Sequence, residues 1–356
     1  MRPSVQVRVP VVRGAPDGPT SVVIQALDAL EAGARPLVVD ENSGWLAAAL
    51  DRLGATAQHW RRFAVGISTA APWPEAADCT SALVRLGKDR RALAMALDAA
   101  ASVVAPGGAV VLFGANAEGI KSAGKALEAV ADGVVTIDTR RHSRVLAGRR
   151  RNDIPGLRGT LDAWREVHEI ALNGKTRPWI SYPGVFASGQ LDDGTAMLLD
   201  HLPVLARGAA VLDMACGSGI IGAVVRERFE EATVDLVDSD AAAIEATREN
   251  APGTTRICGD GLGAAPRARY DAILSNPPIH DGVAESLAFL QQLIAEAPSR
   301  LKHGGILQIV IQSRIRALPW FEAAFKEATI VAQDRRFLII RGIAGSAVRP
   351  TRRGAR

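Results

Sequence analysis

The sequence predicts an α/β protein of two tandem units, each built around a largely parallel β-sheet. Its 356 residues suit two domains of ordinary size. Short apolar runs alternate with segments of helical periodicity, as expected for parallel strands that are joined by helices. Both halves also repeat one order of signals: a strand, a polar or glycine turn, a helix, and later a Gly-Gly turn into a buried strand. This echo predicts that one domain was duplicated.

The N-terminal unit shows the first series of elements. Residues 36–40 form an apolar run that ends in an acid, and 45–53 have the Leu/Ala spacing of a helix. A second strand is expected at 82–86, followed by a helix over 92–104. A Pro-Gly-Gly turn then introduces a buried strand at 109–114.

A charged stretch that ends in proline, residues 149–155, predicts the domain boundary. Apolar spacing after it predicts a helix over 157–172. The Pro- and Gly-rich stretch 175–194 then predicts a long binding loop. The expected division is an N-terminal domain over 1–155, a second domain over 156–345 and a disordered tail over 346–356.

The second unit has the more regular pattern, and it predicts a mostly parallel sheet of seven strands. Helices are expected between most of these strands. The expected strands are 209–214, 233–237, 255–258, 270–275, 306–311, 328–332 and 336–341, and the expected helices are 220–229, 240–250 and 283–297.

Composition excludes several classes of protein. Hydrophobic residues make up 48% of the chain and charged residues 22%, which is typical of a globular protein and not of a disordered or fibrous one. No apolar run is long enough to span a membrane, and the N-terminus does not resemble a signal peptide. Three scattered cysteines predict neither a disulfide framework nor a zinc site. We therefore expect a cytoplasmic protein without a metal.

The positive charge lies mainly in the first half of the chain. The net charge is +4, of which residues 1–177 contribute +5 and residues 178–356 contribute −1. Six arginines fall between positions 140 and 151. Such a cluster can follow RNA phosphates, or it can be a solvated arginine-rich linker, and composition does not decide between the two.

Two features of the second unit predict a nucleoside cofactor. Gly217 and Gly219 follow the strand that contains Asp213, and a glycine turn before a helix lets a ligand approach the backbone. Ala215 stands where a dinucleotide turn would have its first glycine. Asp238 lies 21 residues after Gly217 at the end of the next strand, where an acid can bind ribose hydroxyls. The alternative for the glycine turn is a tight strand–helix corner. The alternative for the acid is that it caps the next helix, and we assign that cap to Asp240 instead of Asp238.

A third feature follows the strand at 270–275. Pro277 and Pro278 fix two φ angles and lack N–H donors, and Asn276 is held extended because it precedes a proline. The result is a stiff segment that presents carbonyl acceptors, which suits an amine with two N–H groups. The alternative is a simple turn that starts a helix.

With these motifs in place, the second unit resembles the class I methyltransferases that depend on S-adenosylmethionine (SAM). Over about residues 36–341 the chain is similar to the small-subunit ribosomal RNA guanine-N2 methyltransferases, in which a degenerate methyltransferase copy precedes an active one. The fold expected from the resemblance is two tandem Rossmann-like domains, of which the N-terminal one is degenerate. The stretches that carry it, besides the Asn-Pro-Pro motif, are 82–88, 114–122, 182–186 and 191–195.

The resemblance also implies roles for single residues. Asp213, Ala215, Gly217 and Gly219 would shape the SAM pocket, and Asp238 would bind the ribose. Asp260 would bind the adenine amino group, and Phe186 would lie on a loop that covers the cofactor. Asn276 would form part of the cofactor pocket.

The same resemblance implies how the target amine is held. Asn276 and the carbonyl of Pro277 would bind it and act as the catalytic pair, with Pro278 and Ile279 beside the base. Related enzymes usually have an aromatic residue where Ile279 stands. Stacking on the base would then come from elsewhere, for example from Phe186 or Trp179.

These features together predict a monomeric enzyme that methylates the N2 amine of a guanine in ribosomal RNA or the small ribosomal subunit. Two alternatives stay open: methylation of another planar nitrogen, such as an adenine amine or a protein glutamine, and a non-catalytic RNA-binding or ribosome-assembly factor. A nicotinamide oxidoreductase is disfavoured because three glycines in the usual spacing are missing. The N-terminal unit has no matching glycine turn, so we expect it to stabilise the catalytic unit and bind RNA but not SAM.

Overall fold

A computed structural model describes residues 14–87, 89–278 and 284–345 of the chain. Contacts within the chain divide it into two compact units. The first ends at Arg165, compared with the boundary expected at 155, and it also takes in the short segment Tyr182–Gly184. The second starts at Glu166. The expected tail over 346–356 lies outside the described residues.

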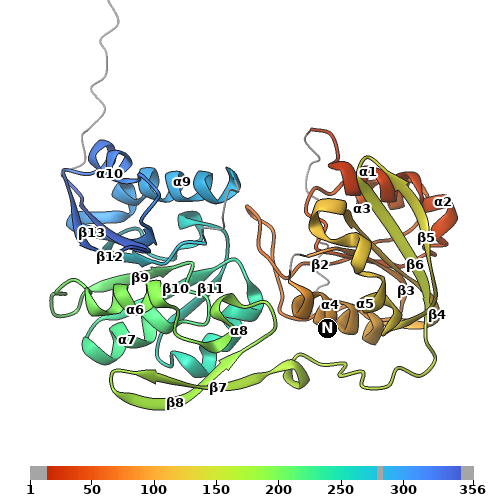
Figure 1. Cartoon of the computed structure of the whole chain (residues 1–356), viewed down its shortest axis with the longest axis horizontal. Coiled ribbons are helices and arrows are strands. Elements are labelled where there is room, and N and C mark those ends of the chain that lie inside the picture. Colours follow the sequence, from red (N-terminus) through yellow and green to blue (C-terminus); the bar gives the residue numbers. More distant parts are fainter. Residues whose placement is uncertain (1–13, 88, 279–283, 346–356) are drawn as a thin grey trace, which may run out of the picture. The chain divides into compact units, whose positions relative to one another are not determined.

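The N-terminal unit is a six-stranded sheet with helices on both faces (Figure 1). Its strand order is β2-β1-β3-β4-β6-β5, in which the first four strands are parallel and β6 runs antiparallel to both of its neighbours. One face packs against α1, α2 and α3, and the other against α4 and α5. The elements are α1 (Gly18–Gln25), α2 (Leu27–Leu30), β1 (Pro36–Val39), α3 (Trp45–Arg52), β2 (Gln58–Trp60), β3 (Cys79–Arg85), α4 (Arg90–Val103), β4 (Val104–Ala115), η1 (Asn116–Glu118), η2 (Ile120–Ser122), α5 (Gly124–Glu128), β5 (Ala131–Arg140), β6 (Ser143–Arg150) and η3 (Asp162–Trp164).

The C-terminal unit contains the expected seven-stranded, mostly parallel sheet, in the order β11-β10-β9-β12-β13-β15-β14. Only β15 runs antiparallel to its neighbours. Helices α6, α7 and α8 cover one face, and α9 and α10 cover the other (Figure 1). The elements are β7 (Glu166–Leu172), β8 (Lys175–Ser181), η4 (Phe186–Gly189), α6 (Asp193–Asp200), β9 (Ala210–Met214), α7 (Ile220–Arg228), β10 (Thr233–Asp238), α8 (Ala241–Asn250), β11 (Thr255–Cys258), η5 (Leu262–Ala264), β12 (Tyr270–Ser275), α9 (Ala284–Arg300), β13 (Leu301–Gln312), α10 (Leu318–Ala324), β14 (Glu327–Gln333) and β15 (Phe337–Ile343).

The two sheets have the same topology apart from one strand. If β1 is matched to β9, every strand of the N-terminal sheet has a counterpart in the same order, and only β11 has none. Both sheets even share one irregularity. The register between β3 and β4 shifts from Cys79/Val104 to Ser81/Ala109, and that between β12 and β13 shifts from Tyr270/Leu301 to Ala272/Ile306.

The Gly-Gly turns that the sequence signals lie inside these register shifts. A Cβ added at Gly108 would lie 2.5 Å from the carbonyl oxygen of Thr80, and one at Gly305 would lie 3.1 Å from that of Tyr270. Glycine is therefore required where each bulged strand passes close to its neighbour. The shared bulge confirms that the two units are versions of one fold.

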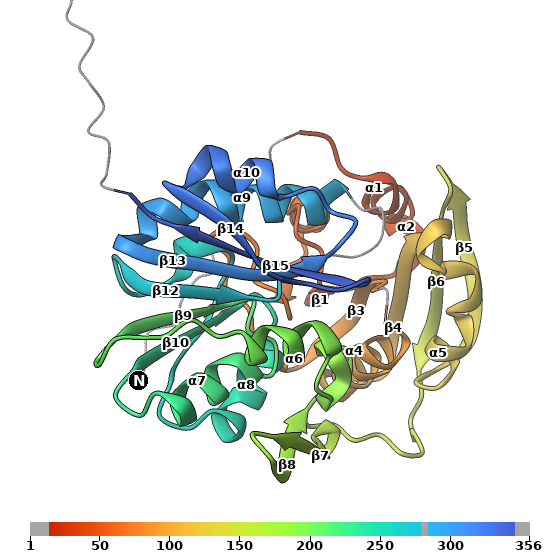
Figure 2. The same ribbon diagram turned by 60° about the vertical axis from the view of Figure 1, so that its left-hand side comes forward.

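The helix expected over 157–172 is wrong, and the loop expected over 175–194 starts only after residue 181. Residues 166–181 form the antiparallel hairpin of β7 and β8, set off from the seven-stranded sheet (Figure 2). Asn173 and Gly174 both have positive φ, 50° and 72°, as in the two-residue turns that suit the twist of a hairpin. This Asn-Gly signal was in the sequence and outweighs the helical spacing.

The arginine cluster between 140 and 151 lies on β5, β6, their turn and the residue directly after β6, so it is not a linker. Several of its charges are compensated. Arg140 pairs with Asp138, Arg149 with Glu31, and Arg151 with Asp132 at 2.7 Å. The cluster is therefore less positive than the sequence alone indicates.

Candidate active site

The candidate site lies where the carboxyl ends of β9, β10 and β12 meet. These strands are parallel neighbours at the centre of the sheet, so the turns that follow them share one edge. In open α/β sheets this edge is where ligands bind. Of the site residues expected from the sequence, Ala215, Gly217 and Asn276 lie in these turns and Phe186 lies in η4, and the start of α6 adds Asp192 and Thr195.

The glycine turn after β9 has three residues with left-handed backbone. Ala215, Gly217 and Gly219 have φ of 56°, 53° and 90°, and Gly219 precedes the first residue of α7. A Cβ on Gly219 would also lie 3.0 Å from Thr247 Cγ2. Ala215 adopts a conformation that normally costs a residue with a Cβ about 1 kcal/mol or more. The turn thus keeps a strained alanine to hold its shape.

The hairpin of β7 and β8 supports this turn from behind. Trp179 is fully buried, and its Nε1 donates to Ser218 Oγ at 2.9 Å. Asn250, at the end of α8, bonds both the backbone N–H and the carbonyl of Ile180 and also donates to the carbonyl of Ser218. The idea that Trp179 stacks on a base is therefore wrong, because its ring is enclosed in the core.

Asp238 closes the turn from the end of β10. Its Oδ2 accepts from Gly217 N at 2.8 Å and its Oδ1 from Asp240 N at 2.8 Å. Burial raises the pKa of Asp238 to about 6. Asp240 is the N-cap of α8 and accepts from Ala242 N at 2.9 Å, as expected. Asp238 is thus bonded to the glycine turn itself.

Asp213 lies behind the turn rather than in the pocket wall. It is fully buried, and its Oδ2 accepts from Gly222 N of α7 at 2.9 Å. Its Oδ1 is buried and has no hydrogen-bond partner among the described residues. Burial raises the pKa of Asp213 to about 7. The buried acid fixes α7 against β9, and its Oδ1 leaves one unpaired oxygen beneath the turn.

Asn276 follows β12 and is held by two residues of a different segment. Its Nδ2 donates to Asp192 Oδ2 and to Thr195 Oγ1, each at 2.9 Å. Asp192 is the N-cap of α6, and its Oδ2 also accepts from Thr195 N. A carboxylate only accepts, so the amide must turn its nitrogen toward Asp192. The amide oxygen is then the group that Asn276 has left to offer a ligand.

These residues line one pocket with the loop that contains Phe186. The wall includes Asp192, Thr195, Ala215, Gly217, Asn276 and Phe186. Phe186 is 52% exposed, and its Cβ lies 3.9 Å from where a Cβ on Gly217 would be. Ala187 and Ser188, which follow it, both have positive φ. The loop therefore lies directly over the glycine turn.

The other expected site residues have separate positions. Pro277 is buried and Pro278 is exposed, directly after Asn276. Asp260 is exposed and lies two residues past the end of β11, which pairs with β10. Ile279 lies outside the described residues. Asp192 and Thr195 lie in the stretch 191–195 that carries the resemblance, but no role was predicted for them. Their sequence signal is an Asp-x-x-Thr cap pattern, whose contact with Asn276 spans more than 80 residues.

The same edge of the N-terminal unit has different chemistry. In the N-terminal unit the last residue of β1 pairs with Trp60, and in the C-terminal unit the last residue of β9 pairs with Val237. Arg61, the residue after Trp60, therefore corresponds to Asp238. By the register of β3 and β12, Arg85 stands where the other unit has Asn276. Glu41 fills the turn after β1, accepting from the backbone N–H groups of Ser43 and Gly44.

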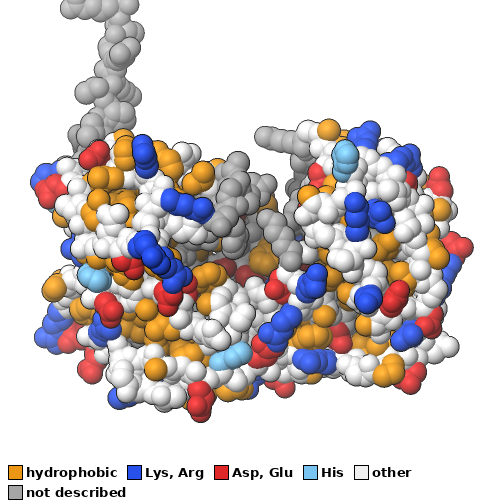
Figure 3. All heavy atoms as spheres, in the orientation of Figure 1, with side chains coloured by type: hydrophobic (Ala, Val, Ile, Leu, Met, Phe, Trp, Pro, Cys, Tyr) orange, Lys and Arg blue, Asp and Glu red, His pale blue; other side chains and the backbone are white. Residues whose placement is uncertain are grey.

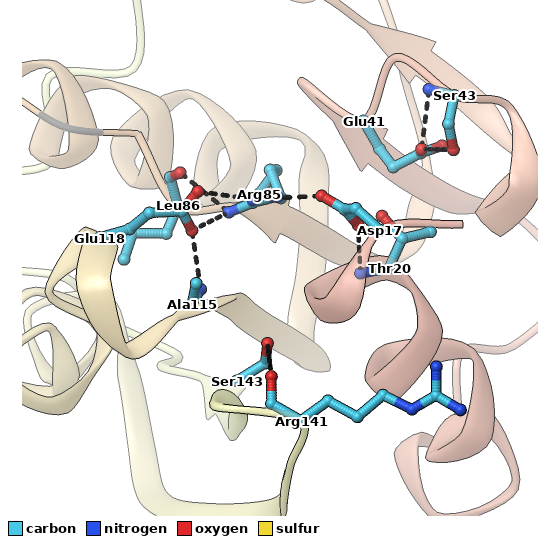
Figure 4. A network of polar contacts seen from close by, with 10 residues as sticks. All are labelled: Asp17, Thr20, Glu41, Ser43, Arg85, Leu86, Ala115, Glu118, Arg141 and Ser143. Carbon is cyan, nitrogen blue, oxygen red and sulfur yellow. Dashed lines mark hydrogen bonds and ion pairs between the residues drawn. The ribbon is translucent and has the colours of Figure 1, made fainter. Parts of the chain in front are cut away.

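Figure 4 shows how Arg85 is held. It donates to both carboxylate oxygens of Glu118, at 2.6 and 2.7 Å, and contacts Asp17 at 3.5 Å. Asp17 caps α1 and accepts from Thr20 N, just as Asp192 caps α6 and accepts from Thr195 N. The cap and its contact with the end of the central strand are thus common to both units, although the strand-end residue has changed from amide to guanidinium.

Comparisons with known proteins agree with this arrangement. Residues 178–341 match the family model described as methyltransferase small domain, and residues 54–164 match that of its N-terminal domain. A ribosomal RNA small subunit methyltransferase C of Alcanivorax borkumensis is 33% identical over 91% of this chain and 98% of its own length. The corresponding protein of Pseudomonas entomophila is 35% identical over 74% of this chain and 79% of its own length.

A solved structure with the same two-unit fold is a 16S rRNA N2 G1207 methyltransferase of T. thermophilus in complex with AdoMet and guanosine. It has a TM-score of 0.80 and 22% identity, and the match covers 94% of each chain. Fold, site and family models together define a methyltransferase. Within that class, the chain belongs to the family of the ribosomal RNA small subunit methyltransferase C proteins.

Among the described residues, no group of three or more His, Cys, Asp or Glu side chains is placed to hold a metal ion. In the same part of the chain, no helix is both long and apolar enough to cross a membrane.

Proposed function

We propose that this chain transfers a methyl group from SAM to the exocyclic N2 amine of a guanine in small-subunit ribosomal RNA, and that the C-terminal unit carries the reaction. The observation that carries the proposal is the position of Asn276, with its amide nitrogen bound by Asp192 and Thr195 at the edge of the pocket beside the glycine turn. The family relatives are named for ribosomal RNA methylation.

The residues of the pocket fit SAM. Gly217 leaves the turn without a side chain on the pocket side, so a ligand can lie against the backbone, whereas Gly219 is needed where the turn packs against Thr247 of α8. Asp238 and Asp260 stand at the ends of neighbouring strands, where they would bind the ribose and the adenine amino group. The unpaired Asp213 Oδ1 lies beneath the turn, where a cationic ligand would stabilise the ionised form of this acid against the cost of its burial. When bound, SAM supplies the methyl group on its sulfonium.

The residues of the Asn-Pro-Pro segment prepare the nucleophile. The lone pair of a guanine N2 amine is delocalised into the ring, so the free amine is a poor nucleophile. The Asn276 oxygen and the Pro277 carbonyl are two acceptors that would bind its N–H groups and turn the lone pair toward the methyl group. This is catalysis by positioning and by preorganised acceptors, and it does not need a strong base. The base must be unpaired or flipped out to reach the segment.

Phe186 would close over the cofactor from the loop that precedes α6. Phe186 contributes an exposed aromatic ring to the pocket wall. Among the described residues of the wall it is therefore the one best placed to stack on the base. The N-terminal unit would stabilise the catalytic unit and bind RNA without binding SAM, because Arg61 replaces the ribose acid and Glu41 fills the turn.

The variant Asn276→Ala tests the proposal. It removes one acceptor of the target amine but leaves the glycine turn intact, so we expect SAM to bind with unchanged affinity while turnover falls by about a hundredfold or more, as when one preorganised contact to a transition state is lost. SAM affinity is measured by titration calorimetry, and turnover by transfer of labelled methyl groups to small-subunit ribosomal RNA. Unchanged turnover in Asn276→Ala would remove the basis of the proposed mechanism.

A further inference from the structure

The N-terminal unit contains an open groove of about 870 Å³ beyond the carboxyl ends of β3 and β4. Residues that follow β3 form one wall, among them Leu86, Gly87 and Arg90. Residues from η1, η2 and α5 that follow β4 form the other, among them Lys121 and Lys125. The groove is thus built by the turns after two adjacent parallel strands, which is where α/β sheets place ligands.

The groove is the counterpart of the substrate side of the active site. β3 corresponds to β12 and β4 to β13, so Leu86 and Gly87 stand where the catalytic unit has Pro277 and Pro278. The cofactor side of the same edge has changed its chemistry, with Arg61 in place of the acid and Glu41 in the turn. The degenerate copy has therefore lost the cofactor half of the site and kept a groove at the substrate half.

The groove is lined by positively charged side chains that can bind an anionic ligand. Arg90, Lys121 and Lys125 are exposed, and none forms an ion pair within the part of the chain that the structure describes. Of the two acids in the lining, Glu118 is bound by both Arg85 nitrogens, and Glu128 remains. Burial opposes the charge on Glu118, but the hydrogen bonds from Arg85, the N–H of Ala115 and the charge of Arg85 together outweigh it and lower the pKa of Glu118. In Figure 3, Lys and Arg side chains gather over α4 and α5.

The shape of the groove suits the sugar-phosphate backbone of a nucleic acid better than a base. A Cβ placed on Gly87, Gly119 or Gly124 would meet nothing within 4 Å, so the lining is open to a ligand at three glycines. The lining contains no aromatic side chain on which a base could stack and no free acid at the position of Asp238. Exposed cations around open backbone suit phosphate groups, which fix the position of an RNA strand without reading its sequence.

We propose that this groove binds backbone phosphates of the ribosomal RNA substrate through Arg90, Lys121 and Lys125, and so holds the RNA while the C-terminal unit methylates it. The proposal rests on the proposed function for the identity of the RNA. It assigns the RNA contact to the groove and not to the arginine cluster on β5 and β6, where Arg140, Arg149 and Arg151 are paired with acids.

The test compares two triple variants of the full chain that remove the same charge. One is Arg90→Gln/Lys121→Gln/Lys125→Gln, and the other is Arg140→Gln/Arg149→Gln/Arg151→Gln. Affinity for deproteinised small-subunit ribosomal RNA is measured between about 50 and 300 mM salt. Three lost phosphate contacts should make the slope of log affinity against log salt shallower by about two to three. We expect this for the groove variant only, with the wild-type slope in the second variant.

Kinetics and a conservative variant complete the test. The groove variant should raise the KM for RNA while kcat and SAM affinity stay at wild-type values, and Lys121→Arg/Lys125→Arg should keep the wild-type salt slope. Equal slopes for all variants, or equal losses in both triple variants, would overturn the proposal. If wild-type protein methylates RNA but the groove variant binds it normally, the groove assignment fails and the proposed function stands. If RNA binding depends on the groove but no RNA is methylated, the groove assignment stands and the proposed function fails.

Discussion

At the residue scale, the site depends on an amide that is oriented by a helix cap. Asp192 Oδ2 accepts from Thr195 N within α6 and from Asn276 Nδ2 across the pocket, so one oxygen fixes both the helix start and the amide. Because the carboxylate cannot donate, the amide cannot flip without losing its hydrogen bond to Asp192. Asp192 therefore acts as a positioning residue for Asn276.

Replacing Asp192 separates this role from helix capping. Asp192→Ala should lower kcat by about tenfold to a hundredfold while SAM affinity changes little, because Asn276 loses its orientation; this corresponds to about 1.4 to 2.7 kcal/mol in the barrier. The loss of the cap should also destabilise the fold by about 1 kcal/mol. Kinetics and urea unfolding measure the two effects.

Asp17→Ala is the matched control, since Asp17 caps α1 in the same way in the N-terminal unit. It should cost a similar free energy of unfolding and leave kcat unchanged. Equal losses of kcat in both variants would mean that Asp192 acts only through stability.

The contact between Asp192 and Asn276 could not be derived from the sequence. The Asp-x-x-Thr pattern predicts a cap, and the Asn-Pro-Pro segment predicts acceptors at a strand end, but nothing local says that the two meet across more than 80 residues. Asp240, by contrast, was correctly assigned as a cap, because its donor, Ala242 N, is only two residues away. Local hydrogen bonds are encoded locally, whereas this one depends on where α6 packs.

At the element scale, the turns after β1 and β9 explain why the two units should differ in cofactor binding. The turn after β9 is bare at Gly217 and is closed by Asp238, whereas the turn after β1 is filled by Glu41, and Arg61, directly after β2, takes the position of Asp238. Both turns start with a positive φ, at Asp40 and Ala215, so their backbones are similar. The difference in cofactor binding therefore comes from the side chains.

We therefore expect one SAM to bind per chain. Asp238→Arg copies the residue of the N-terminal unit into the catalytic one, and it should weaken SAM binding by a hundredfold or more, because it replaces an acceptor with a buried cation beside the ligand. Titration calorimetry gives both stoichiometry and affinity. Two sites in the wild type, or wild-type affinity in Asp238→Arg, would contradict this reading of the turns.

Elements with regular periodicity were predicted well from the sequence, and the hairpin was not. The strands of the C-terminal sheet and helices α7 and α8 fall within a few residues of their expected ranges. The error over 166–181 has a physical cause: apolar spacing suggested a helix, but Asn173 and Gly174 favour a two-residue turn that pairs the flanking residues as strands. Strands β5 and β6 were missed because their arginines suggested a linker.

At the scale of the whole molecule, the free energy of unfolding should depend on pH through buried acids of the catalytic unit. Burial raises the pKa of Asp213 to about 7 and that of Asp238 to about 6 from an ordinary value of 3.8. Between about pH 4 and pH 7 the folded chain then binds more protons than the unfolded chain, so these groups lower stability as pH rises. His59, with its pKa lowered to about 4 by burial, has the opposite effect.

The difference between wild type and Asp213→Asn isolates one of these groups. The variant keeps an acceptor for Gly222 N but does not ionise, so its stability relative to wild type should rise with pH by up to about 1.4 kcal/mol per pH unit between pH 4 and pH 7, and then level off. Urea unfolding at several pH values measures it. A difference that does not change with pH would show that Asp213 titrates normally.

Duplication is the feature of the whole molecule that the sequence showed only weakly. Its clearest marks are the shared strand order, the shared bulge at the Gly-Gly turns and the two Asp-x-x-Thr caps. These marks depend on backbone geometry, which tolerates wide changes in side chains. The resemblance of the C-terminal motifs to methyltransferases was readable because a glycine turn and two prolines are local backbone requirements.

The most direct test of the central claim is methyl transfer from labelled SAM, offered in parallel to small-subunit particles, deproteinised ribosomal RNA and total protein, and followed by nucleoside and amino-acid analysis. We expect the label in N2-methylguanosine from the ribosomal RNA, in the particles or in the free RNA. Label in another nucleoside or in protein glutamine would contradict the guanine assignment, and SAM binding without transfer to any of the three would contradict the proposed reaction.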